Sequence, residues 1–150
     1  MSAQLDHPAR PRRLGRSILA VVAGIAVGIA LSVGTDWGLH VIGVLPGQNE
    51  RWPNQLLLLA LVYRSIYGVI AGYVIARLAP NRPMGHSLFA GGLGMLVSTL
   101  GVVSSWNSTV GQHWYPIALA LTAIPTAWIG AKLRLMQFRT EAKAHAAQAK

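Results

Sequence analysis

The chain has 150 residues and a formal net charge of +9, yet only 11% of its residues are charged. A soluble domain carries roughly 25% charged residues, so this deficit points away from one. With 53% hydrophobic residues and a mean hydropathy of +0.43, the composition indicates a membrane protein of one domain. The absence of Cys excludes disulfides, thiolate zinc sites and thiol catalysis.

Residues 1–16 form a short polar arm with four Arg residues. The arm resembles the charged start of a signal peptide, so cleavage has to be considered. The apolar stretch that follows covers residues 17–45, whereas a signal peptide has an apolar region of about 7–15 residues. A spanning helix needs about 20 residues. This length predicts an uncleaved first transmembrane helix, tilted or protruding at its far end.

Three further apolar runs are separated by segments rich in turn-forming residues, and they predict spans at about 56–79, 85–105 and 115–135. Asn54 precedes the second span and is placed to cap it. Pro125 lies in the middle of the last span and predicts a kink there. Thr122 and Thr126 offer hydroxyl groups to the backbone carbonyl that Pro125 leaves without a donor.

The predicted fold is therefore all-α, a bundle of four transmembrane helices over residues 17–135. The basic arm, residues 1–16, precedes it, and a tail, residues 136–150, follows it. The tail is rich in Ala, Lys and Gln, which favours a continuation of the last helix into water.

Basic and aromatic residues divide between the two ends of these spans. All but two of the 13 Lys and Arg residues lie in the arm, in the tail with the end of the last span, or around the turn with Arg77 and Arg82. Trp52, Trp106 and Trp114 belong to the other loops or their edges. The positive-inside rule then predicts cytoplasmic termini in a multi-pass plasma-membrane protein, with an aromatic belt on the opposite side.

The same distribution argues against nucleic acid as a partner. The basic residues follow the ends of apolar runs and do not interleave with aromatic residues, as a groove for single strands would require. Anionic lipid at the cytoplasmic face of the bilayer is the expected partner for this charge.

Asp36 is the acidic residue inside the first apolar run, and Arg64 is the basic residue deep inside the second. A carboxylate at a helix centre costs about 2.5–3.5 kcal/mol on insertion scales, so a partner is expected. Asp36 and Arg64 are equally far along the chain from Glu50, in the intervening loop. An antiparallel hairpin would place them at similar depth, and we predict that they pair in the outer third of the membrane.

Two interpretations of this pair stay open. One is a structural ion pair that locks two helices, which keeps the carboxylate ionised. The other is a substrate or proton site, because His40 lies one turn after Asp36 and Tyr67 one turn after Arg64, with Tyr63 beside them. We favour the structural interpretation.

Small residues recur at four-residue spacing on three of the predicted helices, and this spacing allows helices to approach closely. The glycines expected at helix contacts are Gly24, Gly28, Gly34, Gly38, Gly68 and Gly72.

Signatures of enzymes and cofactor sites are missing from the sequence. Gly91-Gly92-Leu93-Gly94 lies inside a predicted span and lacks the Lys of a phosphate-binding loop. No two His residues have the spacing of metal ligands. We therefore predict that the chain is not an enzyme and holds no cofactor or metal.

Short motifs spread over nearly the whole chain resemble a known group of proteins. They are Asp36 with His40, Tyr63-Arg64, Ala76-Arg77-Leu78-Ala79-Pro80, Arg82-Pro83-Met84, His113-Trp114-Tyr115-Pro116 and Pro125-Thr126-Ala127-Trp128. Together they look like those of small bacterial four-helix inner-membrane proteins of unknown function. The resemblance implies a bacterial inner membrane and no particular activity.

The small multidrug transporters are similar in length and helix number, with an acidic residue in the first span. This chain differs because its carboxylate lies late in that span and has a predicted Arg partner. We therefore expect a non-enzymatic membrane protein with a structural or accessory role, with a second copy or another membrane protein as candidate partner. The alternative is a small transporter or channel with an outward-facing polar cavity around Asp36, His40 and Arg64.

Overall fold

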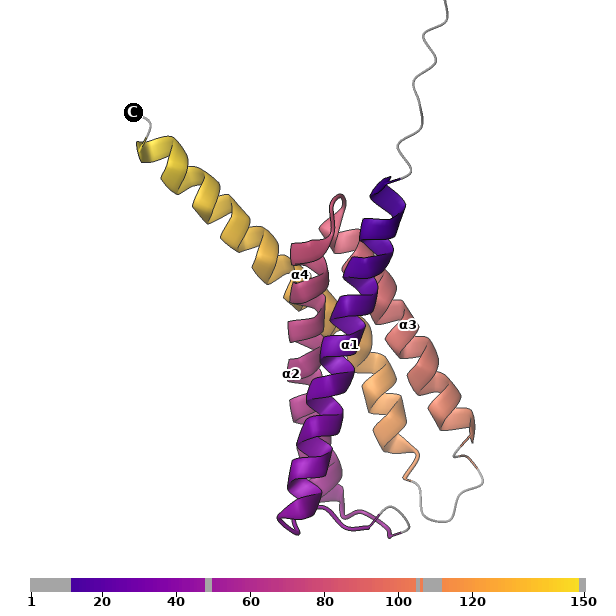
Figure 1. The fold of residues 1–150 in the computed structure, drawn as a ribbon. Coiled ribbons are helices and arrows are strands. Elements are labelled where there is room, and N and C mark those ends of the chain that lie inside the picture. Colours follow the sequence, from indigo (N-terminus) through magenta and orange to yellow (C-terminus); the bar gives the residue numbers. More distant parts are fainter. Residues whose placement is uncertain (1–11, 48–49, 105, 107–111, 149–150) are drawn as a thin grey trace, which may run out of the picture.

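The computed structural model describes residues 12–47, 50–104, 106 and 112–148. These residues form four helices and no strand: α1 (Arg12–Val41), α2 (Asn54–Leu78), α3 (Pro83–Ser104) and α4 (Trp114–Gln148) (Figure 1). The predicted all-α fold with four long apolar helices is confirmed for the described part of the chain. Each helix is long and apolar enough to cross a membrane.

The helices alternate in direction, so the bundle has two distinct ends (Figure 1). The turn end holds the start of α1, residues 79–82 between α2 and α3, and the point where α4 leaves the bundle. The loop end holds the α1–α2 and α3–α4 connections. The last part of α4 continues beyond the turn end and leans away from the other helices (Figure 1).

The first helix ends four residues before the predicted boundary, because Gly43 stops it. Gly43 has φ +75°, its N–H donates to the carbonyl of His40 at 3.0 Å, and the N–H of Val44 donates to the carbonyl of Leu39 at 2.9 Å. This pair of bonds is a Schellman motif, which satisfies the last carbonyls of a helix. The apolar residues up to Leu45 therefore belong to the loop.

The second helix begins at Asn54, which does not act as its cap. Pro53 occupies the capping position, with no side-chain hydrogen bond to the helix. The Asn54 side chain instead accepts a hydrogen bond from the Trp114 indole at 3.1 Å. Gln112 donates to the carbonyl of Trp52 at 2.9 Å. These two bonds join the α1–α2 connection to the start of α4 at the loop end.

Close contact between α2 and α4 forms the centre of the bundle. A Cβ atom built on Gly72 would lie 2.6 Å from the carbonyl oxygen of Ala127, so only glycine fits there. A Cβ atom built on Gly130 would lie even closer to the α2 backbone at Val69, and 2.6 Å from the backbone nitrogen of Tyr73. At the same residue of α2, the buried Ser87 hydroxyl donates to the carbonyl of Gly72 at 2.9 Å and attaches α3.

Four of the six glycines expected at helix contacts lie at such contacts. A Cβ on Gly24 would meet Ile75, one on Gly28 would meet Ala71, and one on Gly68 would meet Thr126, as Gly72 meets Ala127.

Gly34 and Gly38 differ from the expectation, because a Cβ at either position would have no described neighbour within 4 Å. Within the described part of the chain, neither glycine therefore packs against another helix. In this half of α1, Thr35 and Asp36 make the hydrogen bonds to α2. Asp36 is two residues from each glycine, so the glycines lie on the other face of the helix.

Pro125 lies inside α4, as the sequence predicts, but the two threonines do not compensate for it in the expected way. A proline at this position leaves the carbonyl of Leu121 without its helical donor. The Thr122 hydroxyl donates to the carbonyl of Ala118 at 2.9 Å, and the Thr126 hydroxyl donates to that of Thr122 at 2.8 Å. Both hydroxyls therefore serve other carbonyls.

Candidate functional site

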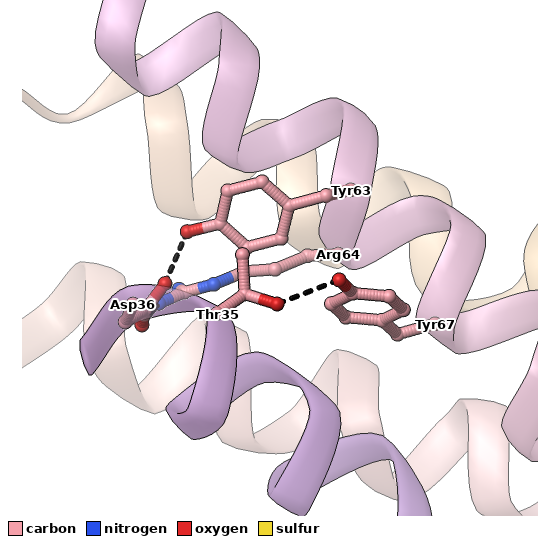
Figure 2. Close-up of polar contacts among 5 residues, drawn as sticks. All are labelled: Thr35, Asp36, Tyr63, Arg64 and Tyr67. Atoms are coloured by element: carbon pink, nitrogen blue, oxygen red, sulfur yellow. Dashed lines mark hydrogen bonds and ion pairs between the residues drawn. The ribbon is translucent and has the colours of Figure 1, made fainter. Parts of the chain in front are cut away.

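Charged and hydroxyl-bearing side chains of α1 and α2 meet in the loop-end half of the bundle. We call Thr35, Asp36, Tyr63, Arg64 and Tyr67 the polar cluster (Figure 2). They face each other because the antiparallel hairpin brings residues on either side of the loop to the same height. One helical turn separates Tyr63 from Tyr67, so both project from the same face of α2.

The ion pair at the centre of the cluster is short and direct. Nη2 of Arg64 donates to Oδ2 of Asp36 at 2.6 Å. The two side chains are about equally exposed, at 30% and 29%. The structure therefore places the predicted pair in contact, at a half-buried position between the two helices.

Tyr63 completes the environment of the carboxylate. Its hydroxyl donates to Oδ1 of Asp36, so each carboxylate oxygen accepts a hydrogen bond from α2 (Figure 2). Tyr63 itself is buried. The carboxylate of Asp36 is therefore held at both of its oxygens by side chains of α2.

Tyr67 belongs to the cluster but does not touch the ion pair through a hydrogen bond. Its hydroxyl lies 2.7 Å from the Thr35 hydroxyl, which forms a second polar link between α1 and α2 (Figure 2). The rings of Tyr63 and Tyr67 lie 5.7 Å apart, centre to centre.

His40 is one turn further along α1 and stands apart from this network. It is exposed, and among the described residues no hydrogen bond joins its ring to Asp36. It lines a cavity of about 370 Å³ near the loop end, together with Asp36, Trp37 and Trp52. His40 and Asp36 therefore line the same cavity, but no hydrogen bond joins them among the described residues.

Tyr115 is a neighbour of Arg64 that the sequence pattern did not single out. Its ring centre lies 5.8 Å from the guanidinium carbon of Arg64. This is within the range of a cation–π contact. Tyr115 starts α4 at the loop end, where sequence reasoning placed only an aromatic belt.

Two cavities adjoin Arg64, and their walls are mainly apolar. One, of about 480 Å³, lies between α1 and α3 and reaches both Asp36 and Arg64. The other, of about 200 Å³, lies deeper, against α4. Hydroxyl groups in its wall, such as Ser65 and Thr126, donate to carbonyls of their own helices. The space beside the ion pair is thus suited to apolar groups.

The expected polar cavity around Asp36, His40 and Arg64 is therefore divided into two spaces. Asp36 lies at the boundary, with Arg64 on the α3 side and His40 on the loop side. Within the described ranges, no three His, Asp or Glu side chains come close enough together to hold a metal ion.

Comparison of the chain with protein-family models, with curated proteins and with solved structures finds no match in any of the three.

Proposed function

We propose that this chain is a multi-pass protein of a bacterial inner membrane, with both termini in the cytoplasm and a structural or accessory role rather than an enzymatic one. The observation that carries the structural role is the arrangement around Asp36. Both carboxylate oxygens are engaged by α2, one by Arg64 and one by Tyr63. A carboxylate bonded in this way holds α1 against α2.

Membrane insertion is supported by the surfaces of the helices. In the most apolar window of each helix, between 11% and 28% of the residues are buried inside the bundle. Large apolar side chains such as Leu19, Leu58 and Leu96 are exposed. A soluble monomer rarely exposes contiguous apolar surface on this scale. Lipid is the partner that would cover it.

The orientation is supported by charge at the turn end. Arg77 and Arg82 lie there, and the Lys132 ammonium lies 4.5 Å from the ring centre of Trp128. The positive-inside rule assigns this end to the cytoplasm.

Charge reversal tests the structural role. Asp36→Arg alone and Arg64→Asp alone each place two like charges together, so we expect either change to reduce the amount of folded protein in the membrane. The double variant restores opposite charges and is expected to recover most of that amount. Reversal of the longer pair Arg134 and Glu141, whose N–O distance is 3.6 Å and in which Glu141 is 60% exposed, serves as the matched control and should change little. A double variant that stays unfolded would contradict a structural ion pair.

One observation favours a second candidate, a small transporter or channel. Cavities reach Asp36 from two sides, between α1 and α3 and from the loop end. The same double variant separates the two functions in a strain that lacks the native gene. If the variant is folded but does not restore the phenotype of that strain, the pair has a role in transport. If folding and phenotype recover together, the structural role stands.

A further inference from the structure

A groove at the turn end separates α1 from α3 and lies outside the polar cluster. We call it the turn-end groove; its volume is about 470 Å³, and its lining includes Ile18, Val21, Val22, Arg82, His86 and Phe89. Most of this lining is apolar. Ile18, Val22 and Phe89 expose 63%, 55% and 61% of their surface, so no other described part of the chain covers this wall.

Arg82 gives the groove a positive charge that the described chain does not neutralise. The two ion pairs among the described residues join Arg64 to Asp36 and Arg134 to Glu141, so neither involves Arg82. His86 lies one turn into α3, and its Nδ1 is 3.1 Å from the Arg82 carbonyl oxygen. The groove therefore has a cationic rim at the helix ends and an apolar wall directed toward the bundle centre.

The backbone at Arg82 adds a second observation. Its φ of +46° lies in the left-handed region, and Arg82 is the one residue other than glycine with such a value among those described. Glycine would adopt this conformation without steric cost, whereas the Cβ of any other residue makes it less favourable. The arginine side chain is thus presented at the groove by a strained turn.

An amphiphile with an anionic head fits this distribution of charge and apolar surface. Basic pockets between membrane helices on the cytoplasmic side bind phospholipid head groups. A second copy of the chain fits less well, because every copy carries +9 and would bring a further excess of positive charge to the rim.

We propose that the turn-end groove binds one anionic phospholipid from the bilayer. Its phosphate contacts Arg82, and an acyl chain lies along Ile18, Val22 and Phe89. The site rests on the proposed membrane insertion, which places the rim at head-group depth. Its chemical class is a glycerophospholipid with net negative charge, such as phosphatidylglycerol.

Lipid retention tests the site directly. The full chain is placed in nanodiscs of equal parts phosphatidylcholine and phosphatidylglycerol, released into detergent, and its bound lipids are counted by native mass spectrometry. Arg82→Gln keeps the backbone strain and removes the charge, and we expect about fivefold less retained phosphatidylglycerol. Arg77→Gln is the matched control, because Arg77 is exposed at the same end outside the groove, and should retain the lipid.

A second pair of variants tests the apolar wall independently of charge. Val22→Trp fills the groove and should displace the bound lipid. Leu19→Trp adds the same side chain to an exposed position of α1 outside the groove, and should not.

Three results would overturn the site. Equal loss in Arg82→Gln and Arg77→Gln would indicate attraction to the whole basic end. Equal retention of phosphatidylcholine would indicate a groove without head-group selectivity. Disulfide-linked dimers of Phe89→Cys, in a chain that otherwise lacks Cys, would indicate a second copy in the groove.

Insertion is measured separately, by resistance of the membrane-bound protein to alkaline extraction. An extractable protein would contradict the proposed function. A resistant protein with unselective lipid binding would contradict the groove alone.

Discussion

Asp36 is the side chain on which the polar contacts between α1 and α2 converge. It receives one hydrogen bond from a buried phenol and one from a cation, while Thr35 beside it contacts Tyr67. Interhelical hydrogen bonds inside membranes are individually modest, at about 0.6 kcal/mol on average. A charge left without its partner costs far more than a bond is worth. The residues of the polar cluster are therefore expected to contribute unequally to stability, and Arg64 is expected to contribute most.

Removal of the Tyr63 hydroxyl gives a graded test of this ranking. Tyr63→Phe leaves the ion pair intact, and we expect the free energy of unfolding to fall by about 1 kcal/mol. Arg64→Leu leaves the carboxylate unpaired, and a loss of about 3–5 kcal/mol is expected. Unfolding in mixed micelles, followed by tryptophan fluorescence, measures both. Tyr73→Phe is the control, since among the described residues the Tyr73 hydroxyl donates only to the exposed Gln137, at 2.7 Å.

If Tyr63→Phe costs as much as Arg64→Leu, the phenol rather than the guanidinium is the main partner of the carboxylate.

At the scale of whole helices, the two neighbours of α2 are held in different ways. Glycine and alanine let α2 and α4 approach until backbone meets backbone, at Gly72 and Gly130. The contact with α1 is apolar at the turn end, where Gly24 meets Ile75, and polar at the loop end. Small residues set how closely α2 and α4 approach, and hydrogen bonds set the register of α1 against α2.

A matched pair of glycine substitutions tests the close approach. The Cβ of Gly72→Ala would meet the Ala127 carbonyl at 2.6 Å, so the helices have to separate, and we expect a loss of about 1–3 kcal/mol. Gly38→Ala meets no described neighbour and removes a flexible residue from a helix, which favours folding by about 0.5–1 kcal/mol. Thermal aggregation in detergent measures both.

An unchanged midpoint for Gly72→Ala would show that α2 and α4 are less closely packed than described. A destabilised Gly38→Ala would show that another molecule contacts this face of α1.

Much of this architecture follows from the sequence, and what does not follow has physical causes. Length and hydropathy predict four helices, and the hairpin arithmetic around Glu50 predicts which charges meet. The face of α1 at Gly34 could not be predicted, because four-residue spacing of small residues marks every close packing face and also occurs by chance in a glycine-rich chain. The end of α1 depends on Gly43, whose left-handed backbone overrides the apolar residues that follow.

The contact of Tyr115 with Arg64 was beyond the sequence for another reason. It joins α2 to α4, and nothing in a linear pattern fixes how two helices that are not consecutive rotate against each other. The division of the expected cavity into two spaces could not be predicted for the same reason, because it depends on where α3 lies relative to Asp36.

For the molecule as a whole, the main statement to test is its orientation. Single cysteines report it well, because the chain has none of its own. Glu50→Cys lies at the loop end and Thr140→Cys in the exposed part of α4 beyond the turn end. With a membrane-impermeant maleimide, we expect intact spheroplasts to label Glu50→Cys, and Thr140→Cys to react only after permeabilisation. The reverse pattern would place the termini outside.

The exposed end of α4 gives a second test at this scale. Among the described residues, a chain that stops after Gln137 loses only exposed side chains and the ion pair between Arg134 and Glu141, in which Glu141 is 60% exposed. Its unfolding free energy should stay within about 1 kcal/mol of that of the full chain. Unfolding in mixed micelles checks this. A larger loss would mean that the extension stabilises the bundle through contacts absent from the isolated chain.

The ion pair has a further consequence for biogenesis. If the chain inserts into a membrane as proposed, Asp36 reaches the translocation machinery before Arg64 does, and on insertion scales each charge opposes partition by about 2.5–3.5 kcal/mol at a helix centre. A hairpin that enters as one unit presents a neutral pair to the lipid, whereas a lone first helix would present a bare carboxylate. The order of synthesis and the placement of Arg64 on the adjacent helix therefore favour joint entry of α1 and α2, with α3 and α4 added to a hairpin that is already closed.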